Sequence, residues 1–364
     1  NVKFVFVATN KSAQDILKKK NLDVIFYNAN LIDRIFSLFY LSDLLKFVLG
    51  KFGIQNKFEK FCKEKKIDII FFAGQSRYSL FCDDVNFTTI IHEIHHLIRP
   101  DLPEYKGNNN FDLREKIIDH STKKAMSVIV DTELTKEEVT KHYRCHKDKV
   151  NIIPLSSSLV EKDFNLNEIE NEKLKEVLEK KLSFYFYPAQ FWPHKNHLYI
   201  LNALKILKDE YKKEFFFIFC GHKKHNFNFI NKKIIEMDLE RNVIVLERIN
   251  ESEVITLYKS CEALVWPAYI GALGLPVIEA FYFKTPVFYT KNQIDKKYRK
   301  YVNEIDIKDP SSLAKALIEK DNALLNNKVN EANKCFMENF SENNLEKLYK
   351  NFLKDLEIKL SIYK

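Results

Sequence analysis

The feature that most constrains this chain is a regular alternation of short apolar runs with amphipathic helical patterns along almost its whole length. Near-continuous apolar strands that alternate with helices are typical of parallel sheets covered by helices on both faces. Pro154 and the serines at 156–158 interrupt this series, and the alternation then restarts. The length of 364 residues also exceeds what one hydrophobic core usually organises. The sequence therefore predicts two doubly wound α/β domains.

The predicted elements follow directly from these runs. In the first half, strands are expected at 2–8, 24–27, 68–73, 88–92, 127–130 and 150–153, and helices at 13–20, 31–49, 57–65, 113–126 and 135–142. In the second half, strands are expected at 184–187, 215–220, 243–246, 263–266 and 286–289, and helices at 165–181, 196–208, 229–237, 251–259 and 275–283. A last amphipathic helix is expected after the N-cap residue Ser341, with Leu345, Leu348, Phe352 and Leu356 on one face.

These elements predict domains at 1–157 and 158–340, followed by a C-terminal helix at 341–364 that packs back toward the first domain. The stretch 31–50 is unusually apolar, but charged residues interrupt it, so it does not span a bilayer. It is interpreted as a core helix or, alternatively, as a helix that faces a membrane and meets a lipid-linked substrate.

Composition excludes several classes of protein. The net charge of +8 comes mostly from scattered lysines, whereas nucleic-acid binders concentrate basic residues on one stripe, so no nucleic-acid partner is expected. An anionic substrate or membrane surface suits this charge better. The six cysteines are widely spread without a C-x-x-C pair, and no signal peptide is visible, which predicts a cytoplasmic location. With only seven glycines, the chain has neither of the two common glycine-rich phosphate loops, so phosphate must be bound by helix N-termini and side chains.

Two turns of the second domain carry the residue types that bind a nucleotide diphosphate. Lys195 lies where the first strand of that domain passes into a helix, and a lysine there can lie against a diphosphate beside the helix N-terminus. In Gly274-Leu275-Pro276 the glycine lets the backbone approach a ligand, and the proline fits the first turn of a helix. Glu279 follows one turn later, where its carboxylate can accept both hydroxyls of a ribose. Since both turns end parallel strands, we predict a nucleotide-diphosphate site at that sheet edge.

Two segments around these residues carry a resemblance to a known family. They are PAQFWPHKNH at 188–197 and GLPVIEAF at 274–281, the latter followed by KTPV at 284–287. They resemble the retaining, nucleotide-sugar-dependent glycosyltransferases of the GT-B fold, family 4, of the type that builds bacterial surface polysaccharides. The resemblance covers 184–288, and the loop KDPSSL at 308–313 also fits it. It implies an α/β GT-B fold, in which two Rossmann-like domains face a central cleft.

The first half resembles this family in the expected order. TIIHEI at 89–94 is similar to a strand whose terminal histidine lines the sugar site, PDLPE at 100–104 with Phe111, Arg114 and Glu115 is similar to a bacterial segment, and VNIIP at 150–154 is similar to the end of the first domain. The resemblance implies catalytic roles for His92 and Glu93. It also implies diphosphate binding by Lys195, Gly274, Leu275 and Pro276, nucleoside binding by Glu279 and Arg248, and a sugar site that includes Gly271, His96, Gln190 and His194.

The chain also departs from the family pattern at three places. The earlier of two glutamates in the family's acidic motif falls on Gly271, and the arginine that commonly precedes the phosphate lysine is missing, with Gln190 and His194 nearby instead. The glycine-rich loop after the family's first strand is absent. We therefore expect residues 1–10 to correspond to a later strand, so that the first domain lacks its first strand.

Two other functions compete with this interpretation. The residues HEIHH at 92–96 match the H-E-x-x-H signature of zinc proteases, which requires both histidines one turn apart on a helix. Thr88 and Thr89 instead favour a strand that runs into the motif, and on a strand His92 and His95 point to opposite faces. Sugar-nucleotide epimerases form the second alternative, since they share the two-domain layout and the nucleotide ligands.

The predicted function is transfer of a sugar, with retention, from a nucleotide-diphosphate donor on the second domain to an acceptor on the first. The acceptor is expected to be a glycan or a polyprenyl- or lipid-linked oligosaccharide of surface polysaccharide synthesis. By resemblance, no metal ion or other cofactor is expected, because Lys195 and the dipole of the helix that contains Glu279 would stabilise the leaving group. The expected location is the cytoplasm, with peripheral association at the inner face of the cell membrane.

Overall fold

The computed structural model describes residues 3–29, 42–52, 56–106, 110–160 and 169–362, and the chain divides into two compact units. The first unit comprises Asn1–Ile91, Phe111–Ile129 and Tyr143–Val150. The second comprises His92–Asn110, Val130–His142 and Asn151–Lys364. Two segments of the first half of the sequence therefore belong to the same unit as the C-terminal half. The predicted domain boundaries at 157 and 340 stay a prediction.

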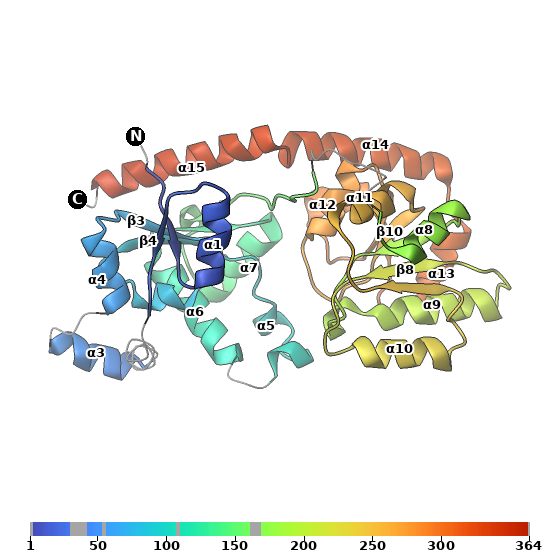
Figure 1. The fold of residues 1–364 in the computed structure, drawn as a ribbon, viewed down its shortest axis with the longest axis horizontal. Helices are drawn as coiled ribbons and strands as arrows, with labels where there is room; N and C mark the ends of the chain where they lie inside the picture. The colour runs from blue at the N-terminus through green and yellow to red at the C-terminus, as the bar shows by residue number, and fades with distance from the viewer. Residues whose placement is uncertain (1–2, 30–41, 53–55, 107–109, 161–168, 363–364) are drawn as a thin grey trace. The chain divides into compact units, whose positions relative to one another are not determined.

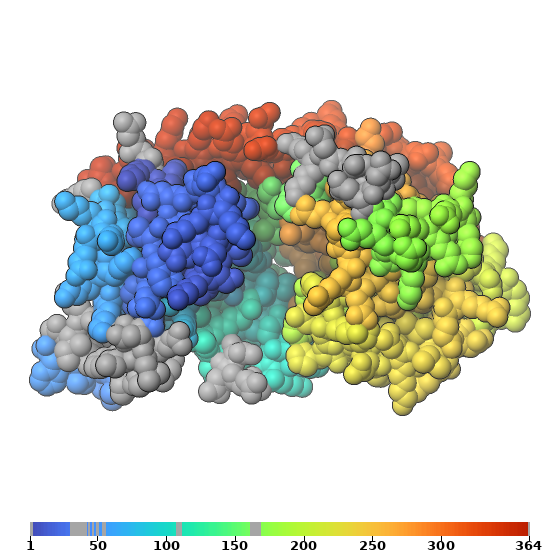
Figure 2. Space-filling model, in the orientation of Figure 1, coloured from blue at the N-terminus to red at the C-terminus, as the bar shows by residue number. Residues whose placement is uncertain are grey.

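The strands of the first half of the sequence form two parallel sheets. Strands β1 (Phe6–Ala8) and β2 (Val24–Phe26) pair with each other around helix α1 (Lys11–Lys19), and this dark blue group is compact in Figure 2. The second sheet has the order β3-β4-β5-β6, with β3 (Ile69–Phe72), β4 (Asn86–Ile90), β5 (Ser127–Val130) and β6 (Val150–Ile152). The helices of this half of the sequence are α3 (Asp43–Lys51), α4 (Lys57–Glu64), α5 (His95–Ile98), α6 (Asn110–Lys124) and α7 (Glu133–Tyr143), with short turns η1 (Arg77–Phe81), η2 (Pro103–Tyr105) and η3 (Lys147–Lys149).

The second unit contains a six-stranded sheet in which each strand is parallel to its neighbours. Its order is β12-β11-β10-β7-β8-β9, with β7 (Tyr185–Tyr187), β8 (Phe217–Cys220), β9 (Val243–Leu246), β10 (Ala263–Trp266), β11 (Val287–Thr290) and β12 (Asn303–Ile305). Figure 1 shows α9 (His197–Asp209), α10 (Phe227–Glu236) and α13 (Pro310–Ile318) on one face, and α11 (Glu251–Ser260), α12 (Leu275–Tyr282) and α14 (Asn322–Asn339) on the other. The remaining elements are α8 (Glu172–Glu179), α15 (Glu342–Ile362), η5 (Pro193–Lys195) and η6 (Lys296–Tyr301).

The sheet of the second unit is covered on both faces, and this explains why its strands are apolar throughout. Every residue of β7, β10 and β11 is buried, so these strands lack the alternation of apolar and polar residues that a half-exposed sheet shows. Aromatic side chains fill much of this core, including Phe186, Phe219 and Phe281. The predicted doubly wound parallel architecture is confirmed for this half of the chain.

The strand order also fixes where a ligand site is expected. From β7 the chain proceeds outward to β8 and β9, returns to β10 on the other side of β7, and continues outward to β11 and β12. The order therefore reverses between β7 and β10, and open parallel sheets bind ligands beyond the carboxyl ends of the strands at such a point. The two turns that matter are thus those that follow Tyr187 and Trp266.

Several predicted elements differ from the structure. The strand expected at 88–92 ends at Ile90, and the helix expected at 165–181 begins only at Glu172 within the described residues. Part of the helix expected at 31–49 lies outside the described residues. Neither β12 nor α14 was predicted. Ser341 directly precedes α15, at the predicted N-cap position, and its carbonyl accepts a hydrogen bond from the backbone N–H of Leu345. Its hydroxyl donates a hydrogen bond to the carbonyl of Met337. Among the helices of the described ranges, none is both long and apolar enough to cross a bilayer.

Candidate active site

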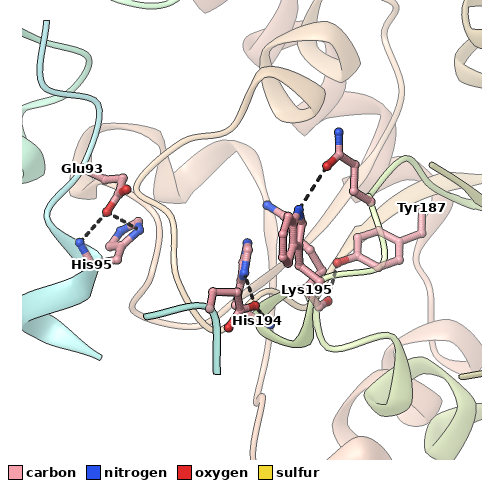
Figure 3. Close-up of polar contacts among 8 residues, drawn as sticks. Glu93, His95, Tyr187, His194 and Lys195 are labelled. Atoms are coloured by element: carbon pink, nitrogen blue, oxygen red, sulfur yellow. Dashed lines mark hydrogen bonds and ion pairs between the residues drawn. The ribbon is translucent and has the colours of Figure 1, made fainter. Parts of the chain in front are cut away.

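The turn after β7 places Lys195 against the end of β10. Residues 193–195 form the turn η5, and Asn196 then adopts the left-handed conformation, with φ of 57°, before α9 begins. The hydroxyl of Tyr187, the last residue of β7, donates a hydrogen bond to the carbonyl of Lys195 (Figure 3). The ammonium of Lys195 lies 4.7 Å from the centre of the Trp266 ring, at the end of β10. The lysine therefore lies at the point where the strand order reverses.

The charge of Lys195 has no close counterion in the part of the chain that the structure describes. Burial lowers the pKa of its ammonium from 10.5 to about 8, and the nearby Glu104 carboxylate opposes this shift. Within the described residues no carboxylate lies within 4.0 Å of the Lys195 nitrogen, which lies over the Trp266 ring. A partly buried cation without an ion-pair partner is stabilised by an anionic ligand.

The N-terminus of α12 lies against the same tryptophan. Gly274 is the N-cap residue, Leu275 and Pro276 are the first two residues of the helix, and no described side chain caps it. A Cβ atom on Gly274 would lie 3.4 Å from Cζ2 of Trp266. The φ of −90° at Gly274 is accessible to any residue, so the backbone does not require glycine here, and the absence of a side chain instead leaves space beside the indole. Lys195 and the α12 N-terminus thus share one aromatic neighbour.

Glu279 is held by two hydroxyl groups. Its side chain is nearly buried, with 7% of the residue exposed. The Ser157 hydroxyl donates to one carboxylate oxygen and the Tyr258 hydroxyl to the other, each at 2.6 Å. Burial raises the pKa of the Glu279 carboxyl, and these two hydrogen bonds oppose the shift. Each oxygen can accept more than one hydrogen bond, so the carboxylate is oriented and still able to accept from a ligand.

His194 and His95 lie close to Lys195. Oε1 of Glu104 accepts hydrogen bonds from the backbone N–H of His194, at 2.9 Å, and from its Nδ1, at 2.7 Å. Figure 3 shows Glu93 turned toward His95, whose backbone N–H and Nδ1 both contact the Glu93 carboxylate. Burial, followed by the charges of His194 and Lys195, lowers the pKa of His95 to about 4. The pKa of His194 is also lowered, mainly by burial.

His92 is paired with a carboxylate. Its Nδ1 lies 2.8 Å from Oδ2 of Asp131, and because a carboxylate only accepts, Nδ1 carries the proton and donates. The His92 side chain is 41% exposed, whereas Asp131 is nearly buried, and this burial raises the pKa of the aspartate. The arrangement fixes the tautomer of His92. Asp131 was not among the predicted site residues.

The zinc-protease alternative fails on geometry. Helix α5 begins at His95, so the two histidines of the signature, His92 and His96, do not lie one turn apart on a helix. Within the described ranges no group of three or more histidine, cysteine, aspartate or glutamate side chains is placed to hold a metal ion. The expected strand does not reach His95, because β4 ends at Ile90, so strand alternation does not set the direction of the His95 side chain.

The remaining predicted sugar-site residues differ in their surroundings. Gly271 has a φ of +133°, which favours glycine, and its carbonyl accepts a hydrogen bond from Tyr289. Gln190 is exposed and accepts a hydrogen bond from the indole of Trp192. His96 is completely buried beside the ring of Tyr105, so in this conformation it presents no atom to solvent. Arg248 is exposed and follows β9, which is two strands away from β7.

Comparison with known proteins identifies one family. Residues 168–351 match the model of the family described as glycosyl transferases group 1. The O-antigen chain mannosyltransferase RfbU of Salmonella typhimurium is 27% identical over 204 residues, which make up 56% of this chain and 51% of RfbU. The chain therefore matches about half the length of this curated relative.

Solved structures of low sequence identity share the fold. A glycosyltransferase from Rickettsia africae ESF-5 superposes with a TM-score of 0.67 at 18% identity, over 99% of this chain and 90% of that one. Anabaena Alr3699/HepE in complex with UDP gives 0.68 at 13% identity, over 97% and 91%. WaaG, a glycosyltransferase involved in lipopolysaccharide biosynthesis, gives 0.59 at 15% identity, over 80% and 79%. These likenesses confirm the α/β GT-B fold.

Proposed function

The chain belongs to the glycosyl transferases group 1 family, and on this premise we propose that it transfers a sugar from a nucleotide-diphosphate donor to a glycan acceptor, with retention. One observation carries the proposal. The ammonium of Lys195 and the N-terminus of α12 lie against the same Trp266 ring, at the point where the strand order reverses. A cation beside an uncapped helix N-terminus is a combination that binds phosphate groups.

The roles of the other residues follow from this anchor. Lys195 and the first turn of α12, from Gly274 to Pro276, would stabilise the negative charge that develops on the departing diphosphate. Glu279 would accept the ribose hydroxyls, and Arg248 would contact the nucleoside. His92, with its tautomer fixed by Asp131, would hydrogen-bond to the transferred sugar near the reacting carbon. No step of this scheme requires a metal ion.

The remaining sugar-site residues keep roles near the transferred sugar in this proposal. Gly271, Gln190 and His194 border the turns after β7 and β10. Glu93 would act through His95, which it contacts with its carboxylate. His96 would need to leave its buried position before it could reach a ligand.

The acceptor is proposed to be a glycan that is linked to a lipid at the inner face of the cell membrane. Helix α3 exposes large apolar side chains, and Leu44 and Phe47 are 71% and 60% exposed. Together with Phe52, 75% exposed, they suit the boundary of a bilayer, and the net charge of +8 suits anionic lipids. The named functions of RfbU and WaaG, in O-antigen and lipopolysaccharide synthesis, agree with such an acceptor.

Membrane association has its own test. Sedimentation with vesicles that contain anionic phospholipid should be strong for the wild type and weak for the double variant Leu44→Ser, Phe47→Ser. The matched control is Phe229→Ser, Ile235→Ser on α10, which removes apolar side chains that are also exposed. Equal sedimentation of both double variants would contradict the role of α3.

The proposed donor site is tested by calorimetry with uridine, guanosine and adenosine diphosphates. Lys195→Ala should weaken the best-bound diphosphate by roughly 10- to 150-fold, since a hydrogen bond to a charged group contributes about 1.5–3 kcal/mol. Lys232→Ala on α10 is the control, because Lys232 is an exposed lysine paired with Glu236. Unchanged diphosphate affinity in Lys195→Ala would sink the assignment. Product analysis after incubation with the donor alone distinguishes a transferase from the epimerase alternative, because an epimerase would interconvert sugars without an acceptor.

A further inference from the structure

Glu104, beside the proposed donor site, has hydrogen bonds to only one of its two carboxylate oxygens among the described residues. Oε1 of Glu104 accepts two hydrogen bonds from His194, whereas Oε2 is buried and has no hydrogen-bond partner among the described residues. The Glu104 side chain as a whole is 11% exposed. A buried charged acceptor without a partner is costly, and in native proteins such an atom calls for a specific explanation.

The fold places this carboxylate firmly. Glu104 lies in the turn η2, directly after Pro103, whose ring restricts the backbone. Its two hydrogen bonds fix it to His194, the residue before Lys195. The carbonyl of His194 in turn accepts a hydrogen bond from the backbone N–H of Tyr269, in the loop between β10 and α12. Glu104 is therefore tied to both turns that form the proposed donor site.

The neighbouring basic residues, Lys195 and His194, leave Oε2 of Glu104 available to a hydrogen-bond donor. The charge of Glu104 opposes the lowering of the pKa values of Lys195 and His194 by burial, so its carboxylate lies near both. Yet no ion pair within 4.0 Å joins Glu104 to Lys195 in the described part of the chain, and the ammonium lies over Trp266 instead. Lys195 can thus bind an anion while Oε2 of Glu104 still needs a donor.

We infer that Oε2 of Glu104 accepts a hydrogen bond from a hydroxyl of the sugar that is transferred, and so helps to select that sugar. The inference rests on the proposed function. A carboxylate next to a bound diphosphate repels it, so only a hydrogen-bond donor of the ligand can make this contact favourable. A nucleotide sugar offers such donors on its ribose and on its sugar. The ribose hydroxyls are assigned to Glu279, which is held elsewhere, by Ser157 and Tyr258.

The test compares free nucleoside diphosphates with nucleotide sugars in Glu104→Gln. The amide oxygen of glutamine can still accept from His194, but the amide nitrogen cannot accept from a sugar hydroxyl. Calorimetry with UDP-glucose, UDP-galactose, UDP-N-acetylglucosamine and GDP-mannose, each against its free diphosphate, gives the ratio of the two dissociation constants. For the sugar that the wild type binds best, the ratio should rise about 10- to 100-fold in the variant. Diphosphate affinity should not fall, because the substitution removes a negative charge beside the diphosphate. Asp101→Asn, an exposed carboxylate three residues earlier, should leave the ratio unchanged.

Deoxy analogues of that sugar test the same contact in the wild type, whatever the stability of the variant. Removal of the hydroxyl that Glu104 accepts should weaken binding at least tenfold in the wild type but not further in Glu104→Gln. This inference would be overturned, and the proposed function would stand, if Glu104→Gln bound diphosphate normally with an unchanged ratio of dissociation constants. The same holds if the losses of affinity caused by the variant and by the deoxy analogue were additive for every hydroxyl. A parallel loss of diphosphate affinity would show that Glu104 only supports the turn. If the wild type bound none of these nucleotides, the proposed function itself would fail.

Discussion

The lowered pKa of Lys195 predicts a specific pH dependence for donor binding. Burial lowers this pKa to about 8 in the free protein, against an ordinary value of 10.5. With a pKa of about 8, the protonated fraction is about nine-tenths at pH 7 and about one-tenth at pH 9. A diphosphate binds the ammonium form, and its negative charge raises the pKa of the lysine in the complex.

The direction and size of the effect follow from this difference. Below pH 8 the free and bound proteins both carry the proton, so affinity is at its maximum. As pH rises through 8 the free protein loses the proton and the complex retains it, so affinity falls. Between pH 7 and pH 9 the dissociation constant should therefore rise about tenfold. The neighbouring imidazoles do not titrate in this window, because the pKa of His95 is lowered to about 4 and that of His194 is also lowered.

The assay is calorimetric titration with a nucleotide sugar, for instance UDP-glucose or GDP-mannose, at half-unit steps of pH. A nucleotide sugar is preferable to a free diphosphate, because it has no terminal phosphate group that titrates near neutrality. Lys195→Arg is the matched control, since a guanidinium stays charged throughout and its affinity should not change across the window. A flat wild-type curve, or the same slope in Lys195→Arg, would refute the assignment of the cation.

Three further predictions concern the rest of the site. Gly274→Ala should keep the melting temperature, because the new methyl group makes only an ordinary contact with the indole, but should weaken diphosphate binding severalfold in calorimetry. Tyr258→Phe removes one of the two hydroxyl groups that orient the Glu279 carboxylate. The preference for a ribonucleoside diphosphate over its 2′-deoxy analogue should therefore fall severalfold. His92→Ala should lower turnover by roughly 10²–10⁴-fold while the nucleotide still binds normally, and Asp131→Asn should lower turnover in the same assay. If His92→Ala and Asp131→Asn instead weaken nucleotide binding and also lower the melting temperature, these residues have a structural role.

The sequence predicted the bounds of several short apolar strands. Strands β5, β9 and β10 have the predicted bounds, because each apolar run ends before a charged residue or a proline. Strand β12 was missed because only Ile305 of its three residues is buried, which leaves no apolar run to detect. The start of α8 depends on a distant contact, since Glu253 of α11 accepts the backbone N–H groups of Glu170 and Asn171. Such a contact has no local signal.

The end of β4 shows how one side chain can change a predicted path. Continued alternation would have turned His95 away from His92. Instead the Glu93 carboxylate accepts the backbone N–H of His95, at the start of α5, and the chain leaves the strand direction. His95 thereby enters the neighbourhood of Lys195, and the sequence pattern alone gave no reason to place it there.

In the site, too, residues with a local sequence signal could be predicted, whereas residues that depend on contacts distant in the sequence could not. Lys195 and Gly274 could be found because each lies between an apolar strand and the helix that follows it. Their supports could not, since Glu104 contacts a residue 90 positions away, and Ser157 contacts one 122 positions away. The only earlier signal for Glu104 was its place in the PDLPE segment, which indicated a family likeness without a role.

Three charged groups of this site together favour one kind of ligand. Among the residues that the structure describes, Lys195 has no close counterion and one buried oxygen of Glu104 has no hydrogen-bond donor. Glu279 has an oriented carboxylate that can accept again. A free nucleoside diphosphate would match the lysine and Glu279, but would leave Glu104 beside a phosphate with no donor between them. A nucleotide sugar supplies hydroxyls at both ends of its diphosphate. The charges therefore favour the intact donor over its product, because only the donor satisfies all three groups at once.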